Sequence, residues 1–285
     1  MKSGLSRDDI KAFEPEAKIG LLATVSPEGL PHLTLITTLQ AKTPTQLMWG
    51  QFCEGHSKNN VRDDPHVAFL VMSLDRKIWR GTARWTGCEK EGEDYIRFNQ
   101  MPMFRYNSYF GIHTVHYMDL VSFAGKEDLS LPGVVGGAMA STVAGGITGL
   151  VRSAGREAPR EILKPWSVKH LSSPTTLKFA AWVKPSGFPQ IIPVIPAYPN
   201  GADRLTVGPV GPSSELIEVP EGASLALFAL NLDMESVLIR GTFSGLAPMR
   251  GRLAASLDID WVYNSMPPLP GQIYPEVPLE PVRSD

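Results

Sequence analysis

The first third of the chain alternates short hydrophobic runs with groups of turn-forming residues. Residues 19–25 form an apolar run rich in β-branched side chains, and the turn sequence Pro-Glu-Gly-Leu-Pro follows it. Polar and apolar residues alternate over 32–38, which predicts a strand with two chemically different faces. Further strands are predicted over residues 46–52, 67–72, 77–86 and 114–123. Short strands at turn spacing favour a small β-barrel.

Polar segments between these runs predict a few short helices. Ser6 is placed to act as the N-cap of a helix that leads into the first strand. The polar residues 54–60 predict a loop that opens a helical turn, and Asp64-Pro65 ends it. Residues 89–99 predict a third helix. The expected fold class is therefore mainly β with a few helices (α+β).

The same pattern returns in the second half of the chain. Four blocks match in one order, which is hard to obtain by chance and indicates two fused domains of one fold. Three blocks match at an offset of 158 residues, and the last matches at an offset of 160. The matched pairs are 23–31 with 181–189, 47–50 with 205–208, 67–75 with 225–233, and Arg80-Gly81-Thr82 with Arg240-Gly241-Thr242.

Composition and charge narrow the class of protein. A chain of 285 residues with 43% hydrophobic residues can form two domains with substantial cores. The net charge of -2 lacks the basic footprint of a nucleic-acid binder, so any anion site must be local. The two cysteines, Cys53 and Cys88, cannot form a disulfide framework or a zinc cluster. They indicate reduced thiols in a cytoplasmic protein, and the polar N-terminus shows no apolar signal core.

The middle of the chain is uncharged and rich in glycine from 129 to 151. This stretch has the length of a membrane span, but spans are dominated by large apolar side chains, so no membrane partner is expected. We interpret it as part of a connector, either a small-residue helix that packs between the two halves or a loop. The predicted organisation is a first domain over 1–128, a connector over 129–165 and a second domain over 166–285. The proline-rich end of the second domain is expected to form an extended strap.

Four segments of the first domain together resemble a known family. They read GLLATVSPEGLPHLTLI, LMWGQF, GHSKNNVRDDPHVAFLV and RKIWRGTARWTG, in this order. The set resembles the pyridoxamine 5'-phosphate oxidase-like, FMN-binding split-barrel superfamily over roughly residues 15–125, and more weakly over 175–247. Members of that family are usually homodimers with the flavin at the dimer interface. The resemblance therefore implies two split β-barrels that form an intramolecular pseudo-dimer, and it leaves a further homodimer open.

The resemblance also implies where the flavin phosphate would bind. It points to Lys58 and Ser57 in the loop and to Thr34 on the second strand. These residue types suit the chemistry, since a phosphate requires a fixed cation, a hydroxyl donor and N–H groups at a helix start. The full set of candidate cofactor-binding residues is Thr34, Thr37, Gly50, Gln51, His56, Ser57, Lys58 and Asn60.

The sequence departs from the oxidase in two places. The second strand of the oxidase carries an arginine and a lysine, whereas residues 34–39 here contain no basic residue. In the second copy, the loop equivalent to Ser57-Lys58 contains no lysine over 211–216, and prolines 193 and 196 limit sheet pairing. We therefore expect at most one flavin per chain. The second copy is expected to supply a wall, with Asp233, Arg240 or Trp261 as candidates.

Other groups of histidine, cysteine and aromatic residues do not predict a specific functional site. His113 and His116 would point to opposite faces of one strand, so no shared metal site is expected. Cys53 has no CxxC partner for redox chemistry. The aromatic residues Phe104, Tyr106, Tyr109 and Phe110 are interpreted as core or interface, with a stacking surface for a ring ligand as the alternative.

The preferred hypothesis is an FMN-binding flavoprotein that acts as an oxidoreductase on a small molecule, with a nicotinamide donor as an alternative partner. In such proteins the flavin carries out the redox chemistry and the protein binds and orients it. No catalytic residue is assigned, so enzyme activity stays open. The competing hypotheses are a split barrel that binds deazaflavin or haem, and a non-catalytic ligand-binding protein with a degenerate site.

Overall fold

Eight stretches of the chain are described by a computed structural model. They are residues 4–14, 17–102, 111–129, 160–194, 197–208, 211–249, 252–264 and 271–278. The chain divides into two units: Met1–Ser130 with Ala181–Ile192, and Leu131–Ala180 with Pro193–Asp285. The predicted aromatic run at 104–110, most of the glycine-rich segment and most of the proline-rich tail lie outside the described residues.

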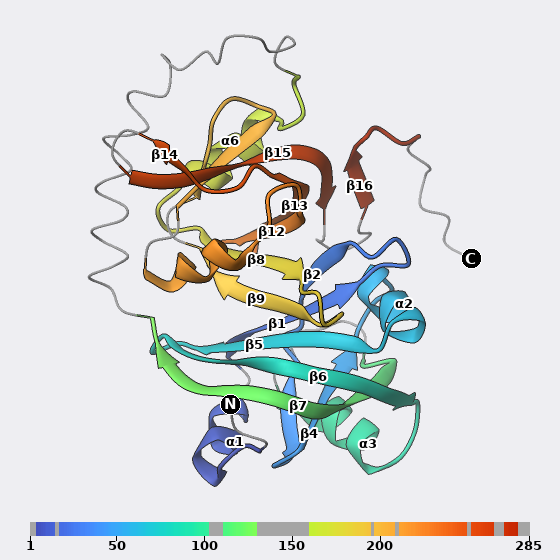
Figure 1. Cartoon of the computed structure of the whole chain (residues 1–285). Helices are drawn as coiled ribbons and strands as arrows, with labels where there is room; N and C mark the ends of the chain where they lie inside the picture. The colour runs from blue at the N-terminus through green and yellow to red at the C-terminus, as the bar shows by residue number, and fades with distance from the viewer. Residues whose placement is uncertain are drawn as a thin grey trace. The chain divides into compact units, whose positions relative to one another are not determined.

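The first unit is an antiparallel sheet accompanied by short helices (Figure 1). Its sheet has the strand order β2-β1-β5-β6-β7-β4-β3. The helices are α1 (Arg7–Phe13), α2 (His56–Asp63) and α3 (Glu93–Gln100). The strands are β1 (Lys18–Val25), β2 (Pro31–Leu35), β3 (Gln40–Thr43), β4 (Gln46–Gln51), β5 (His66–Ser73), β6 (Lys77–Glu89) and β7 (Thr114–Asp128).

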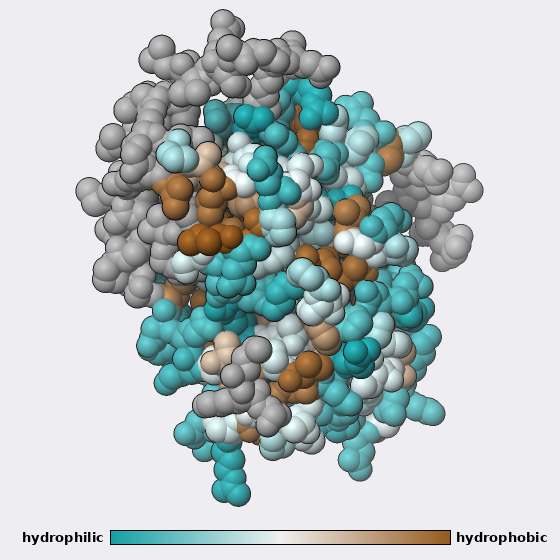
Figure 2. Space-filling view, viewed as in Figure 1, coloured by the Kyte–Doolittle hydropathy of each residue, from teal (hydrophilic) through white to brown (hydrophobic). Residues whose placement is uncertain are grey.

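One hydrophobic core shows that this sheet is curled. Leu22 of β1 and Ala41 of β3 lie near opposite ends of the strand order, yet both pack in one cluster with Trp49, Phe69 and Phe123. A flat sheet could not bring its two ends to a single core, so the sheet wraps around it as a half-barrel. On the face shown in Figure 2, hydrophobic residues form small separate groups among hydrophilic ones.

The second unit is built around the long strand β15 (Arg252–Asn264). Its sheet has the order β10-β11-β15-β13-β12-β8-β9, and β14 and β16 also pair with β15. The remaining elements are α6 (Pro165–Ser172), β8 (Leu177–Val183), β9 (Pro189–Pro193), β10 (Ala197–Pro199), β11 (Arg204–Val207), the 3-10 helix η2 (Gly211–Glu218), β12 (Ser224–Leu230), β13 (Ser236–Phe243), β14 (Ala247–Met249) and β16 (Gly271–Tyr274).

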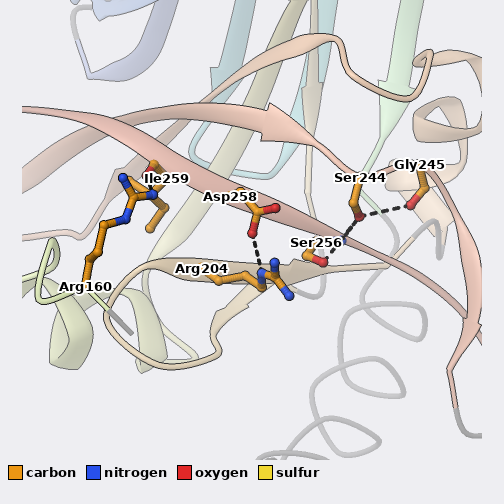
Figure 3. Close-up of polar contacts among 7 residues, drawn as sticks. All are labelled: Arg160, Arg204, Ser244, Gly245, Ser256, Asp258 and Ile259. Carbon is orange, nitrogen blue, oxygen red and sulfur yellow. Dashed lines mark hydrogen bonds and ion pairs between the residues drawn. The ribbon is translucent and has the colours of Figure 1, made fainter. Parts of the chain in front are cut away.

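Polar contacts tie β15 to its surroundings (Figure 3). Arg204 on β11 forms an ion pair with Asp258 across the strand pair. Ser244 Oγ lies 3.2 Å from Ser256 Oγ. The guanidinium of Arg160 donates to the carbonyl of Ile259 at 3.5 Å. Each of these contacts joins β15 to a neighbouring strand or to a residue at the edge of the sheet, which indicates a structural role.

Residues next to the matched sequence segments show the same local backbone geometry at the offset of 158. The Ile36 N–H donates to the Gly20 carbonyl at 2.7 Å, and 158 residues later the Val194 N–H donates to the Lys178 carbonyl at 2.8 Å. Two non-glycine residues with positive φ also recur at this offset, Arg76 (63°) and Met234 (64°). The repeat predicted from the sequence is thus accompanied by repeated backbone geometry.

The repeated Arg-Gly-Thr motif has a backbone explanation. Gly81 and Gly241 each lie at a shift in register against the next strand of their sheet. A Cβ at either glycine would run into a backbone carbonyl oxygen, that of Ser122 or of Asp258. Only glycine permits such an approach. The glycine of the motif is therefore explained by strand packing alone.

The prediction of a mainly β protein with a few helices is confirmed. Some boundaries were wrong. The strand predicted over 32–38 ends at Leu35, because a turn at 37–38 reverses the chain into β3, which the pattern did not predict. The helix predicted over 89–99 begins only at Glu93, because β6 continues to Glu89. The predicted N-cap is confirmed, with Ser6 and Asp9 forming a capping box.

Candidate functional site

Helix α2 brings most of the predicted phosphate-binding residues together. It packs on β1 and β2, and it begins at Gly55 without a capping side chain. Its buried residues are Ser57, Lys58, Asn60 and Val61, which lie on one side of the helix as the 3.6-residue period requires. The predicted loop and helical turn at this place are therefore confirmed as a two-turn helix.

Two side-chain bonds fix α2 to the sheet. Ser57 is fully buried, and its hydroxyl is bonded to the hydroxyl of Thr34 on β2. The Asn60 amide donates to Thr24 Oγ1 on β1 at 3.0 Å. Thr34 is half-buried, so its hydroxyl is the more accessible of the bonded pair. Of the predicted residues, Thr34 can therefore face a ligand, whereas Ser57 and Asn60 hold the helix in place.

Lys58 has an unusual environment for a lysine. Its side chain is only 6% exposed, and it makes no hydrogen bond or ion pair within the described part of the chain. Burial lowers the pKa of its ammonium group, while the charges of Cys53 and Glu54 raise that pKa to a smaller extent. Lysine is rarely buried unless it is paired. In the described residues the ammonium therefore has only the partial compensation of these nearby charges, and no hydrogen-bonded or ion-paired partner.

The ammonium group of Lys58 lies where the helix start adds a second source of positive potential. A Cβ on Gly55 would lie 3.5 Å from Lys58 Nζ, which places the ammonium beside the start of α2. A helix start carries a positive partial charge and N–H groups without helical partners. Two sources of positive potential therefore meet at one place. An anion there would be stabilised by both, as at known phosphate sites.

A directed chain of hydrogen bonds runs beside this site. Trp85 Nε1 donates to His116 Nδ1 at 3.2 Å, and an indole nitrogen can only donate. His116 must then carry its proton on Nε2, which donates to Gln51 Oε1 at 2.9 Å. The Gln51 amide nitrogen donates in turn to Glu54 Oε1 at 3.0 Å. The direction of every bond follows from the indole.

The histidine in this chain is neutral. His116 is fully buried and stacks on Trp49, with ring centroids 3.8 Å apart. Burial, with contributions from Lys58 and Arg62, lowers its pKa to about 3. The hydrogen bonds from Trp85 to Glu54 therefore keep the same donors and acceptors across the physiological pH range. They fix the carboxylate of Glu54, whose charge acts on the ammonium of Lys58.

The other predicted residues have different surroundings. Gly50 lies against the Ile112 side chain, which a Cβ would approach to 2.6 Å, and Thr38 bonds to both of its backbone groups. Thr37 lies in the turn after β2, half-buried, and no contact in the described residues joins it to α2. His56 is exposed, with its ring 5.3 Å from that of His32.

Sequence reasoning missed Glu54, Trp85 and His116 as neighbours of the site. Gln51 was predicted, but both ends of its amide are engaged within the chain, so its role is to position Glu54. The pairing of β4 with β7 brings Gln51 and His116 together across 65 positions. No local pattern carries that information. A polar pair at the ends of two predicted strands was the only available signal.

The residues predicted to form a wall all lie in the second unit. Arg240 lies over the ring of Trp261, with its guanidinium carbon 4.6 Å from the ring centroid. Trp261 stacks on Tyr263 at 5.1 Å and donates to the Gln272 side chain at 2.8 Å. Asp233 lies in the exposed turn between β12 and β13. Arg240 and Trp261 thus belong to one stacked group, and Asp233 does not.

Within the described ranges, no group of three or more histidine, cysteine, aspartate or glutamate side chains could hold a metal ion. His113 bonds to the neighbouring Thr114 hydroxyl, and His116 is part of the hydrogen-bonded chain. None of the helices that the structure describes is long and apolar enough to cross a membrane.

Comparison with known proteins identifies the first unit. Residues 6–112 match the family described as pyridoxamine 5'-phosphate oxidase, so the N-terminal part of the chain carries a domain of this family, as its sequence predicted. A comparison with curated proteins finds no match.

Several solved structures resemble part of the chain. An FMN-binding protein from Syntrophomonas wolfei is 16% identical, with 39% of this chain and 78% of that one covered and a TM-score of 0.35. HupZ from Group A Streptococcus is 12% identical, with 42% and 91% covered and a TM-score of 0.35. An F420 reductase is 17% identical, with 42% and 98% covered and a TM-score of 0.34.

Proposed function

We propose that the first unit binds FMN, with the cofactor phosphate at the start of α2, and that the chain is a flavin-dependent oxidoreductase. The observation that carries this proposal is the buried ammonium of Lys58, which has no partner in the described residues and lies beside an uncapped helix start. The family match over residues 6–112 supports a cofactor of this class.

The residues present fit a phosphate monoester. Lys58 would supply the fixed cation, and the first N–H groups of α2 would supply further donors. Thr34 would add a hydroxyl, held in place by Ser57. The oxidase family's basic residues on the second strand are absent, so Lys58 would carry the charge recognition alone. Removing its charge should therefore have a large effect.

The chain's own groups would bind and orient the cofactor. When bound, a flavin supplies hydride and electron transfer, and the protein supplies orientation and electrostatics. Lys58 would hold the phosphate end, and the Trp85–His116–Gln51–Glu54 chain would keep the neighbouring carboxylate in one position. Glu54 would also limit the excess positive charge before an anion binds. The substrate would be a small molecule or a nicotinamide donor, in the cytoplasm.

The arrangement of the two units is a separate part of the proposal. The repeated segments and the usual dimers of the family favour an intramolecular pseudo-dimer, with the stacked Arg240–Trp261 group in the second copy. This arrangement predicts a solution mass of one chain. A mass of two chains would show that a further homodimer forms.

Spectroscopy and ligand binding test the cofactor directly. We expect FMN to bind the purified full-length chain saturably, with a change in flavin fluorescence and a raised melting temperature. Both effects should be lost in Lys58→Met and kept in Lys90→Met, because Lys90 is exposed. Stabilisation by deazaflavin F420 instead of FMN, or a Soret band on purification, would replace FMN by one of the alternatives. No stabilisation by any of the three would leave a non-catalytic binding protein.

A further inference from the structure

A small cavity lies in the first unit, and none of the residues that line it belongs to α2. Its volume is about 80 Å³, and residues on β5, β6 and β7 and in the tip of the β8–β9 hairpin line it. Residues Ala181–Ile192, which form the end of β8, the turn and most of β9, are grouped with this unit, although β8 and β9 pair in the other sheet. There, Phe188 packs edge-on against His66 of β5 with ring centroids 4.3 Å apart, which anchors the tip to the sheet.

The charges around this cavity are predominantly positive. Arg80 and Lys184 line it, and no acidic residue is among the described residues of its wall. Arg80 Nε is bonded to both carboxylate oxygens of Glu127, at 3.0 and 3.2 Å. Lys184 Nζ donates to the amide oxygen of Gln190 at 3.0 Å, which is a neutral acceptor. The ammonium of Lys184 is therefore bonded to a neutral group and not to a carboxylate.

Hydrogen-bond donors point to the same kind of ligand. Thr82 and Ser122 line the cavity, and their hydroxyl oxygens lie 2.7 Å apart. One hydroxyl proton serves this bond, so the proton of the other hydroxyl is left for a further acceptor. The ammonium of Lys184 has three protons, of which the bond to Gln190 uses one. The wall thus offers several donors beside a net positive charge.

The floor of the cavity is apolar. Phe69 is fully buried, and its ring edge is 3.0 Å from the place that a Cβ of Gly81 would occupy. Because Gly81 has no side chain, the ring edge contributes to the wall. A cavity of this size holds a few water molecules or one small anion. The apolar floor favours an anion that has a non-polar side.

We propose that this cavity is a second anion site, which binds the oxyanion group of a small molecule, a carboxylate or a phosphate. The ammonium of Lys184 and the hydroxyl pair of Thr82 and Ser122 provide the recognition, while Arg80, which is ion-paired with Glu127, forms part of the wall. The site shares no residue with the group around Lys58. It therefore does not depend on flavin binding.

The test uses a chain in which the first anion site has been removed. In the Lys58→Met background, inorganic phosphate and propionate are titrated by calorimetry, and the melting temperature is followed in parallel. We expect one of the two anions to bind with a stoichiometry near one per chain. Tighter binding of propionate would identify a carboxylate ligand, and tighter binding of phosphate would identify a phosphate ligand.

Two further variants attribute the binding to this cavity. Adding Lys184→Met should weaken binding about tenfold or more, because a charge-assisted bond is lost. Adding Thr82→Val, which keeps the shape of the side chain, should also weaken it. Lys126→Met serves as the control, because Lys126 is exposed on β7. Undiminished binding in both the Lys184 and Thr82 variants, or binding of neither anion by the parent, would overturn the proposal.

Discussion

Replacing Lys58 by methionine should make the ligand-free protein more stable while abolishing anion binding. Lys58 is only 6% exposed, and its ammonium makes no hydrogen bond or ion pair within the described residues. Methionine keeps most of the apolar stem and removes the charge. The expected gain therefore comes from a group that the sequence retains at the expense of stability, which is typical of a binding site.

The size of the gain follows from the burial. Placing a neutral polar group in an apolar environment without a hydrogen bond costs roughly 1–3 kcal/mol in protein mutants, and an unpaired ammonium costs more. The nearby charge of Glu54 offsets part of this penalty, since it raises the pKa of Lys58. We therefore expect Lys58→Met to raise the free energy of unfolding by about 1–2 kcal/mol. Urea unfolding at pH 7, compared at equal m-values, measures this difference.

The pH dependence of the stability difference between the wild type and Lys58→Met is a second, independent test of this burial. Burial lowers the folded-state pKa of Lys58 below the ordinary value of 10.5. Below this lowered pKa, folded and unfolded chains both carry the charge, so the full penalty is present. As pH rises toward 10.5, the folded chain loses its proton first, and the unfolded state binds more protons. The wild type then gains stability relative to Lys58→Met, and the difference between them shrinks.

Two results would refute this reasoning. If Lys58→Met is less stable than the wild type while the exposed control Lys90→Met is unchanged, the ammonium must have a compensating partner. If the stability difference is the same at pH 7 and pH 10, burial does not lower the pKa of Lys58. Either result would remove the physical basis for an anion at α2.

Three further predictions concern other parts of the fold. Thr34→Val should weaken FMN binding and lower stability by about 1–2 kcal/mol, because it leaves the buried Ser57 hydroxyl unpaired. Ser57→Ala should weaken FMN binding less than Thr34→Val does, and a flavin titration of both variants measures the difference. Gly20→Ala should lower stability by about 2 kcal/mol or more in urea unfolding, because its Cβ would strike a backbone carbonyl oxygen, whereas Gly271→Ala should be nearly neutral. Burial lowers the pKa of Lys178 to about 8, so stability relative to Lys178→Met should rise between pH 8 and 10.5, and a flat difference would contradict this.

Local features of the fold could be predicted from the sequence because their causes are local. The capping box of α1 needs only Ser6 and Asp9, which are three residues apart. The short helix α2 follows from a polar segment that ends at Asp64-Pro65. The turn residues of the repeat recur with the same φ because each turn is specified within a few residues.

Features that depend on strand pairing could not be predicted in this way. The hairpin of β3 and β4 was missed because residues 37–43 show no strong alternation. The contact between His116 and Gln51 depends on the β4–β7 register, which joins distant segments. The burial of Lys58 was also unexpected from residue type alone, since lysines are mostly exposed.

The burial of Lys58 changes how its neighbours are interpreted. A surface lysine at a helix start could bind any passing anion weakly, because water screens its charge. The charge of a buried ammonium is screened much less, so a bound anion stabilises it more strongly than it would stabilise a surface lysine. The neutral His116 and the directed chain to Glu54 keep a single carboxylate near this charge at every physiological pH. The charge of Lys58 would therefore be partly compensated by Glu54 before binding, and a bound anionic group would complete the compensation. Replacing Glu54 by glutamine should accordingly lower the pKa of Lys58.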